Sequence, residues 1–266
     1  MSTDADLLVD EQGGVLELVL NRPARANSLT ASMADEMTSR IAEAATGDTV
    51  RVIVIRGEGR SFCSGMDLAQ SNAPTRQRPR TGHLLRSMTW GAHRLISTIH
   101  QAQLPVVTVV SGYAAGIGLA LALSGDYILA DETATFWSPF VGRGFSPDSG
   151  TTWLLPRLVG AARAKDMILR ARKVGAVEAE RWGMISELVE SDDLERRARE
   201  IVEEFASAAT VSLGLTKALL NENATATLEQ ALRNEAIHEE LAIRTSDFKM
   251  GMQAFVAKEP PAFSGE

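Results

Sequence analysis

The feature that most constrains this chain is a glycine-rich segment that lies between two apolar, β-branched runs near its middle. Residues 105–110 (Pro-Val-Val-Thr-Val-Val) precede the segment, and residues 126–131 (Asp-Tyr-Ile-Leu-Ala-Asp) follow it. Short runs of this composition predict buried strands. The apolar run at 119–123 between them predicts a helix. The order is therefore strand, glycine-rich loop, helix, strand.

The loop of this unit contains Gly112, Gly116 and Gly118, which allow tight turns of the backbone. The first turn of the following helix has N–H groups without helical partners, and the helix dipole makes that end positive. Such an end can receive a phosphate or a developing oxyanion. The alternative is that these glycines only pack a helix against a sheet.

A second segment has the same design. Residues 50–55 form another apolar run, and the turn after it leads to Gly65, Met66 and Asp67. Two strand ends with free N–H groups can together form a hole with two donors. The sequence therefore predicts an anion site that is built from backbone amides of both loops.

The motifs of both loops resemble those of a known family. Residues 62–68 (Phe-Cys-Ser-Gly-Met-Asp-Leu) and 112–118 (Gly-Tyr-Ala-Ala-Gly-Ile-Gly) resemble the signature loops of the crotonase, or enoyl-CoA hydratase/isomerase, superfamily. The resemblance extends over almost the whole chain, with further matching segments at 20–23, 27–29, 147–150, 155–157, 254–258 and 261–263.

This resemblance implies a fold, a substrate and an assembly. The expected fold class is α/β, with a crotonase-like ββα spiral core over residues 1–200 and a C-terminal helical trimerisation region over residues 201–266. The expected substrate is an acyl-CoA thioester, so coenzyme A arrives with the substrate and no separate cofactor or metal is expected. The family forms homotrimers, which often pair into hexamers.

Composition argues against nucleic-acid-binding, secreted and membrane-spanning classes of protein. The chain has 266 residues and a net charge of −7, which argues against nucleic acid as a partner. Its acidic start resembles neither a signal peptide nor a transit peptide, and no apolar run approaches the ~18 residues of a membrane span. Cys63 is the only cysteine, which fits a reducing compartment. We therefore expect a cytoplasmic protein in which Cys63 fills apolar space.

Helical periodicity is clear in several segments. Thr30 is a candidate helix cap that precedes apolar residues at every fourth position. Residues 83–100 are also predicted as a helix, with Leu84, Met88, Leu95, Ile96 and Ile99 on one face. Residues 70–82 are predicted as a loop, either a solvated one or a lid over the acyl pocket. Further helices are predicted at 160–171, 176–183, 194–209, 213–221 and 228–245.

The resemblance implies roles for particular residues. The family stabilises a thioester enolate, and its motifs assign the two oxyanion donors to the backbone N–H groups of Met66 and Ile117. Asp67 is expected to order its loop. Phe255 is expected either to contact the adenine of a coenzyme A held by an adjacent subunit or to pack in the core. The complete set of expected substrate-binding residues is Ser64, Asp67, Leu68, Ala69, Gly116, Phe140, Phe255 and Lys258.

The acid–base residues differ from those of a hydratase. The family's hydratases add water with two glutamates, and at the matching positions this sequence has Ala120 and Phe140. The turn Pro147-Asp148 resembles that of the isomerase branch, in which an aspartate moves the proton. Asp148 is therefore predicted to be the acid/base. The alternative is that Asp148 only starts a turn or caps the next helix.

His93 leaves a second mechanism open. In the dehalogenase branch of the family, a histidine at this place in the motif acts as a base, and an aspartate in the position of Asp148 acts as a nucleophile. We therefore weigh an enoyl-CoA double-bond isomerase against three alternatives. These are an enoyl-CoA hydratase, a dehalogenase-like or hydrolytic enzyme, and a non-catalytic acyl-CoA binding protein.

Overall fold

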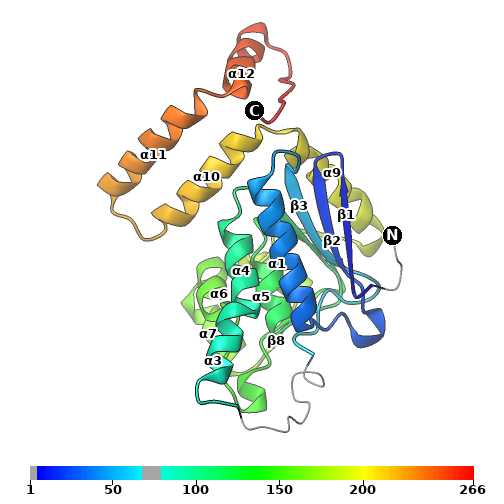
Figure 1. Ribbon diagram of the computed structural model, residues 1–266. Helices are drawn as coiled ribbons and strands as arrows, with labels where there is room; N and C mark the ends of the chain where they lie inside the picture. The colour runs from blue at the N-terminus through cyan, green and yellow to red at the C-terminus, as the bar shows by residue number, and fades with distance from the viewer. Residues whose placement is uncertain (1–4, 68–78) are drawn as a thin grey trace.

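The computed structural model describes residues 5–67 and 79–266, and it is built around a six-stranded sheet (Figure 1). The strand order is β1-β2-β3-β4-β6-β9, and only the pairing of β1 with β2 is antiparallel. A second sheet has the order β5-β7-β8. The strands are β1 (Leu7–Gln12), β2 (Val15–Leu20), β3 (Val52–Gly57), β4 (Val106–Val110), β5 (Tyr113–Ala115), β6 (Tyr127–Asp131), β7 (Thr135–Trp137), β8 (Lys173–Gly175) and β9 (Glu187–Val189).

Helices cover both faces of the larger sheet and form the C-terminal part of the chain. The helices of the first part are α1 (Ala31–Thr46), α3 (His83–Trp90), α4 (Ala92–Gln101), α5 (Ile117–Leu123), α6 (Thr151–Val159), α7 (Ala161–Leu169), α8 (Ala176–Trp182) and α9 (Leu194–Ser207). The last three are α10 (Thr210–Asn223), α11 (Leu228–Ala242) and α12 (Ser246–Ala257). Short 3-10 turns lie at η1 (Pro23–Arg25), η2 (Val141–Arg143) and η3 (Ser191–Asp193).

The central strands are apolar along their whole length because both of their faces are buried. In β3, Ile53 and Ile55 point into the main core, which α1, α4 and α5 also line. Val52 and Val54 point the other way, into a second cluster under α9. Alternate side chains of a strand point to opposite faces, so a continuous apolar run suits a sheet that is covered on both sides. The predicted buried strands are confirmed.

The helix after Thr30 follows the prediction closely. The Thr30 side chain accepts a hydrogen bond from the Met33 N–H at 3.2 Å, which caps the N-terminus of α1. Met33, Met37 and Ile41 are buried on the face that is turned towards the sheet.

Two predicted elements differ in the structure. The helix predicted at 83–100 is divided at Gly91 into α3 and α4, and the Leu84 side chain is 69% exposed rather than part of a buried face. Glycine has a low helix propensity, so it is a natural site for the break. The loop between β4 and α5 contains the short strand β5, which pairs with β7. Much of the predicted loop at 70–82 lies outside the described residues.

The C-terminal helices are attached to the core through α10. Lys217 of α10 donates hydrogen bonds from Nζ to the carbonyls of Ile99 and Leu104, at 3.2 and 3.0 Å, and to Asp126 Oδ2 at 2.6 Å. Beyond this attachment, α11 and α12 extend away from the sheet (Figure 1). Residue 200, the predicted end of the spiral core, lies inside α9, and the chain leaves the sheet after that helix.

Among the described residues, every helix is too short or too polar to cross a lipid bilayer.

Candidate active site

The two glycine-containing loops run side by side and are joined by backbone hydrogen bonds. The Phe62 N–H donates to the Ser111 carbonyl at 2.7 Å, and the Cys63 N–H donates to the Tyr113 carbonyl at 2.8 Å. The Ala115 N–H donates in return to the Cys63 carbonyl at 2.9 Å. These bonds form a parallel bridge between Cys63 and Ala114. Segments 50 residues apart in the sequence are thereby held in a fixed register.

Continuing this register brings Gly65 next to Gly116. A β-carbon on Gly116 would lie 3.7 Å from the α-carbon of Gly65, and one on Gly65 would lie 3.2 Å from the Ala115 carbonyl oxygen. Both glycines have positive φ angles, +111° and +59°, which favour glycine over other residues. The next residue in each loop is a predicted oxyanion donor, Met66 in one loop and Ile117 in the other.

The backbone N–H groups of Met66 and Ile117 are not used by the fold. The Leu29 N–H donates to the Gly65 carbonyl and the Asp67 N–H donates to the Leu29 carbonyl, so the Met66 N–H points away from Leu29. Ile117 is the first residue of α5, where a backbone N–H has no partner inside the helix. Neither amide donates to any residue within 5–67 or 79–266. Two adjacent donors therefore remain available to a ligand.

The end of β7 forms a wall beside Gly116. The Gly116 N–H donates to the Trp137 carbonyl at 3.1 Å. Phe140 is buried, and its ring lies 3.9 Å from the position that a β-carbon on Gly116 would take. The ring of Phe145 meets that of Phe140 edge-on at 5.4 Å. An apolar surface therefore borders the second loop, as expected of a pocket for an acyl group.

Asp148 is half-buried in the turn that leads into α6. Its backbone carbonyl accepts a bond from the Thr151 N–H at 3.3 Å, and its Oδ1 atom accepts one from the Ser149 hydroxyl at 2.6 Å. The turn lies against α4, since a β-carbon on Gly150 would be 3.6 Å from Ile96. α6 packs in turn against α5, which begins at Ile117. The carboxylate and the second loop therefore belong to adjoining elements.

His93 lies on α4, one helical turn before Ile96, and is partly exposed. No hydrogen bond or ion pair joins it to Asp148 or to another residue of the described ranges. The structure therefore does not bring His93 and Asp148 together as a bonded pair, and a catalytic role for His93 stays a prediction.

Ser64 and Asp67 attach the first loop to the segment before α1. The Ser64 N–H donates to the Ala26 carbonyl at 3.0 Å, and its hydroxyl donates to the Arg25 carbonyl at 3.4 Å. Asp67 pairs with Arg22 at 2.9 Å, and both side chains are more than four-fifths buried. This ion pair ties the first loop to the segment before α1, and a role for Asp67 in ordering the loop stays a prediction. Leu68 and Ala69 lie outside the described residues.

Phe255 and Lys258 lie at the end of α12, far along the chain from both loops. The Phe255 side chain is 79% exposed, so it does not pack in the core of this chain, which was one of the two expectations for it. Lys258 ends the helix in a left-handed conformation and is also exposed. Within the described part of one chain, no hydrogen bond or ion pair joins either residue to Met66 or Ile117.

The roles of two buried polar side chains near the site were not predicted from the sequence. Asn27 is fully buried, and its side chain accepts a bond from the Arg22 N–H and donates to the Glu58 and Ser61 carbonyls. It thereby links the segment before α1 to the turn that leads into the first loop. Ser149 was not identified as a partner of Asp148. Both residues lie in turns, where asparagine and serine side chains often form hydrogen bonds with nearby backbone groups. This preference is the signal in the sequence that could have identified them.

Cys63 lies at the junction of the two loops and is fully buried. Burial raises the pKa of its thiol to about 11, and hydrogen bonds with the backbone offset only part of this rise. A thiol in this state is a poor nucleophile. The expectation that Cys63 fills apolar space agrees with its position.

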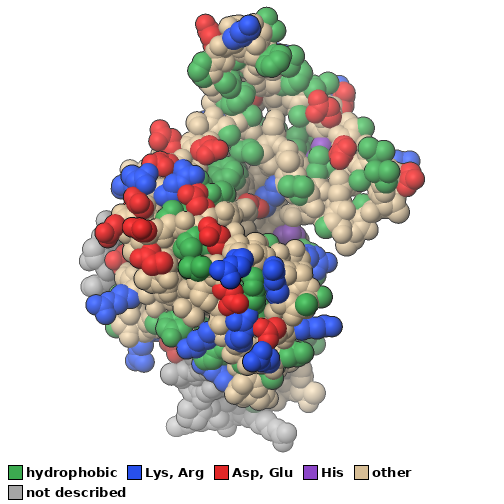
Figure 2. Space-filling model, turned by 180° about the vertical axis from the view of Figure 1, so that it is seen from behind, with side chains coloured by type: hydrophobic (Ala, Val, Ile, Leu, Met, Phe, Trp, Pro, Cys, Tyr) green, Lys and Arg blue, Asp and Glu red, His purple; other side chains and the backbone are tan. Residues whose placement is uncertain are grey.

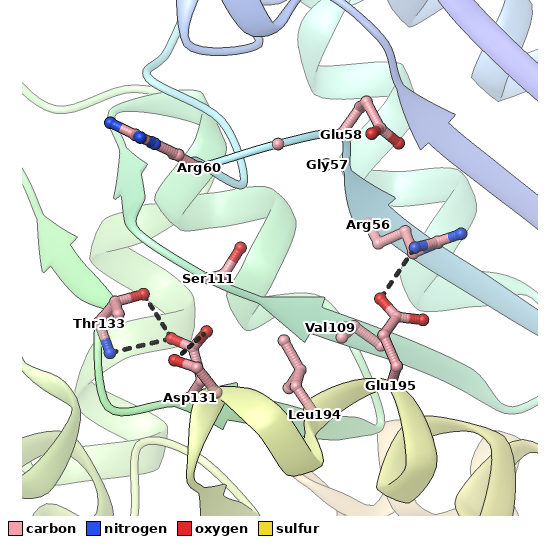
Figure 3. Close-up of a pocket in the computed structure, with 12 residues that line it drawn as sticks. Arg56, Gly57, Glu58, Arg60, Val109, Ser111, Asp131, Thr133, Leu194 and Glu195 are labelled. Carbon is pink, nitrogen blue, oxygen red and sulfur yellow. Dashed lines mark hydrogen bonds and ion pairs between the residues drawn. The ribbon is translucent and has the colours of Figure 1, made fainter.

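A crevice lies elsewhere, at the carboxyl ends of β3, β4 and β6 (Figure 3). It has a volume of about 610 Å³. Three of its charged side chains are paired with protein groups: Arg56 binds Glu195 at 3.0 Å, and Asp131 accepts from Thr133 and Ser191. None of the predicted site residues lines it. Within the described ranges, no cluster of three or more His, Cys, Asp or Glu residues is arranged to hold a metal ion.

Comparisons with known proteins agree with this geometry. Residues 10–266 match the family model described as enoyl-CoA hydratase/isomerase. The chain is 36% identical over 261 residues to the 1,2-epoxyphenylacetyl-CoA isomerase of Escherichia coli, with 98% of each chain covered. It is 30% identical over 254 residues to the short-chain-enoyl-CoA hydratase of Clostridium acetobutylicum, with 95% of each covered.

Solved structures show the same fold. The crystal structure of an enoyl-CoA hydratase from Bacillus anthracis matches with a TM-score of 0.91 and 29% identity, covering 98% of this chain and 100% of the other. Fold and loops together define an acyl-CoA-processing enzyme of the crotonase type. The chain belongs to the enoyl-CoA hydratase/isomerase family, as its motifs predicted.

Proposed function

We propose that this enzyme is an acyl-CoA double-bond isomerase in which the Met66 and Ile117 amides hold the thioester oxygen and Asp148 moves the proton. The single observation that carries this proposal is the pairing of the two loops, which leaves two neighbouring N–H groups without a partner among the residues that the structure describes. Donors aimed at an oxygen where charge develops stabilise the transition state by about 3 kcal/mol each.

The residues around the loops support isomerisation rather than hydration. Ala120 and Phe140 stand where the family's hydratases have glutamates, and both side chains are buried. Neither can transfer a proton, and the loss of a positioned acid–base group typically costs ~10²–10⁴-fold in rate. The similarity to an epoxyphenylacetyl-CoA isomerase points in the same direction.

Asp148 supplies the one chemical step that an isomerase needs. Its carboxylate removes a proton from one carbon of the acyl chain, and the electron pair of that C–H bond moves into the enolate, whose oxygen the two amides bind. The same carboxyl group then returns the proton to another carbon. No oxidant, metal or separate cofactor takes part in this step, since coenzyme A is part of the substrate.

The C-terminal helices support an assembly of several copies. No residue of α11 is buried in a single copy, although the helix carries Leu228, Leu232, Ile237 and Leu241 with at least half of each side chain exposed. Figure 2 shows hydrophobic side chains on the surface of the projecting C-terminal region. We propose that a second and third copy cover these side chains in a homotrimer, or in a hexamer made of two trimers. Lys258 and Phe255 would then contact the coenzyme A of a neighbouring subunit.

Isotope exchange tests the proposed activity. The enzyme is incubated with 3-enoyl-CoA or 2-enoyl-CoA in heavy water, and the position of the double bond and the deuterium content are measured. We expect migration of the double bond in the wild type, a loss of about 10²-fold or more in Asp148→Asn, and no change in Asp35→Asn, which replaces an exposed aspartate on α1.

Other outcomes would identify the alternatives. Isomerisation that survives in Asp148→Asn would exclude Asp148 as the proton carrier. Formation of 3-hydroxyacyl-CoA by the wild type would identify a hydratase. A covalent adduct trapped on Asp148 would support the dehalogenase-like reaction with His93 as base. Tight binding of acyl-CoA without turnover would identify a binding protein.

A further inference from the structure

Ser149 has a backbone conformation and a burial that distinguish it from an ordinary turn residue. Its φ angle is +59°, in the left-handed region that residues with side chains rarely adopt, and it is only 3% exposed. The following residue, Gly150, has a φ angle of +84°. Glycine would adopt either conformation without steric cost. At position 149, the group that serine provides and glycine lacks is a buried hydroxyl.

This hydroxyl is bonded to the carboxylate of the neighbouring residue. Ser149 Oγ donates to Asp148 Oδ1 at 2.6 Å, a length typical of a strong bond between a hydroxyl and a charged carboxylate. The second carboxylate oxygen, Oδ2, accepts no bond from a residue of the described ranges. Asp148 also forms no ion pair with any lysine, arginine or histidine there, including His93, Arg143 and Arg157 on the neighbouring elements. Ser149 is therefore its only charge-stabilising side-chain partner among these residues.

We propose that Ser149 is a positioning residue that occupies Oδ1 of Asp148 and leaves Oδ2 as the atom that carries the proton. This inference rests on the proposed function, in which Asp148 is the acid/base. Oδ2 takes the proton from the substrate carbon while the bonding pair goes to the enolate. It then returns the proton to the other carbon, and the Ser149 hydroxyl keeps its own proton throughout.

The bond has one physical consequence. A carboxylate fixed through one oxygen has fewer rotamers, so its other oxygen spends more time in a reactive position. Without the hydroxyl, the carboxylate would turn more freely, so proton transfer would slow while binding of the substrate stayed the same.

The test uses two variants that remove the hydroxyl and differ in backbone freedom. Ser149→Ala keeps a side chain at φ +59°, whereas Ser149→Gly suits that angle and is expected to fold even if the alanine variant does not. kcat and KM for double-bond migration are measured separately for each variant. Ser191→Ala is the matched control, because that hydroxyl also donates to a carboxylate, Asp131, away from the predicted site.

We expect both Ser149 variants to lower kcat about tenfold, because Oδ2 of Asp148 is held less often in its reactive position. KM should change little, and Ser191→Ala should behave as the wild type. An unchanged kcat in both variants would overturn the inference, and so would a loss in the alanine variant alone, which would point to backbone strain. Full activity of Asp148→Asn would instead reject the proposed function, so the two failures are distinguishable.

Discussion

A β-carbon placed on Gly118 would lie 2.2 Å from the carbonyl oxygen of Cys63. The first turn of α5 is therefore in direct contact with the backbone of the first loop, at a distance that no side chain permits. This contact lies one residue from Ile117 and three residues from Met66. It fixes how closely the two proposed oxyanion donors approach each other.

Replacement of Gly118 by alanine should separate the loops. The added methyl group overlaps the Cys63 backbone, which cannot rotate away as a flexible side chain could. We expect a loss of about 1–3 kcal/mol in the free energy of unfolding and a larger relative loss of kcat, because the donors no longer converge. Urea denaturation and steady-state kinetics measure both.

Gly175→Ala is the control for this change, because nothing lies within 4 Å of a β-carbon at Gly175 and its φ angle of −79° suits alanine. Wild-type activity in Gly118→Ala would show that the close contact is not needed for the site.

Cys63 should be unreactive in the folded enzyme. Burial raises the pKa of its thiol to about 11, so at pH 8 the thiol is protonated and shielded from solvent. We expect no labelling of the native protein by an aromatic disulfide reagent at pH 8, and one thiol per chain after unfolding in guanidinium. Rapid labelling of the native state, with activity lost in proportion, would show that the loops open to solvent.

Removal of the Lys217 ammonium should loosen the C-terminal helices from the core. Lys217→Met removes three hydrogen bonds, each worth about 1 kcal/mol, and leaves Asp126 without its cation. We expect a loss of about 2–3 kcal/mol in unfolding free energy at pH 8. Lys165→Met, which replaces an exposed lysine on α7, is the control and should change little.

The Lys217 effect should depend on pH in a defined direction. Burial already raises the pKa of Asp126, although Lys217 opposes this rise and a third of the side chain is open to solvent. Without Lys217 the pKa of Asp126 should rise further, and the folded state then binds the proton more tightly than the unfolded state. The stability deficit should therefore shrink as the pH falls through that pKa. A deficit that is equal at pH 5 and pH 8 would contradict this account.

Phe255 should contribute to recognition of the nucleotide end of coenzyme A. An exposed aromatic ring that stacks on a base is worth about 1–3 kcal/mol. We expect Phe255→Ala to raise KM for acyl-CoA about tenfold or more at unchanged kcat, and to leave KM for the matching acyl-pantetheine thioester, which lacks the adenine, unchanged. The equally exposed Val256→Ala is the control. Equal increases of KM for both substrates would assign Phe255 to subunit contacts instead.

The sequence was informative wherever a structural feature depends on residues that are close together in the chain. The continuous burial of the apolar part of β3, the Thr30 cap and the positive φ angles of Gly65 and Gly116 all follow from such local preferences. The motifs around these glycines also identified the family. The break at Gly91 was not predicted, because α4 packs in the core while Leu84 of α3 remains exposed, and periodicity alone does not show this difference.

Tertiary structure decided which distant residues meet. The sequence alone gives Cys63 and Ala114 no preference for each other, and their bridge forms because packing of the sheets and helices brings the two loops together. In the same way, only the folded chain places Lys217 beside Asp126. Local propensities act over a few residues, whereas contacts across 50 or 90 residues form only when burial of the whole core compensates for the entropy of ordering the chain between them.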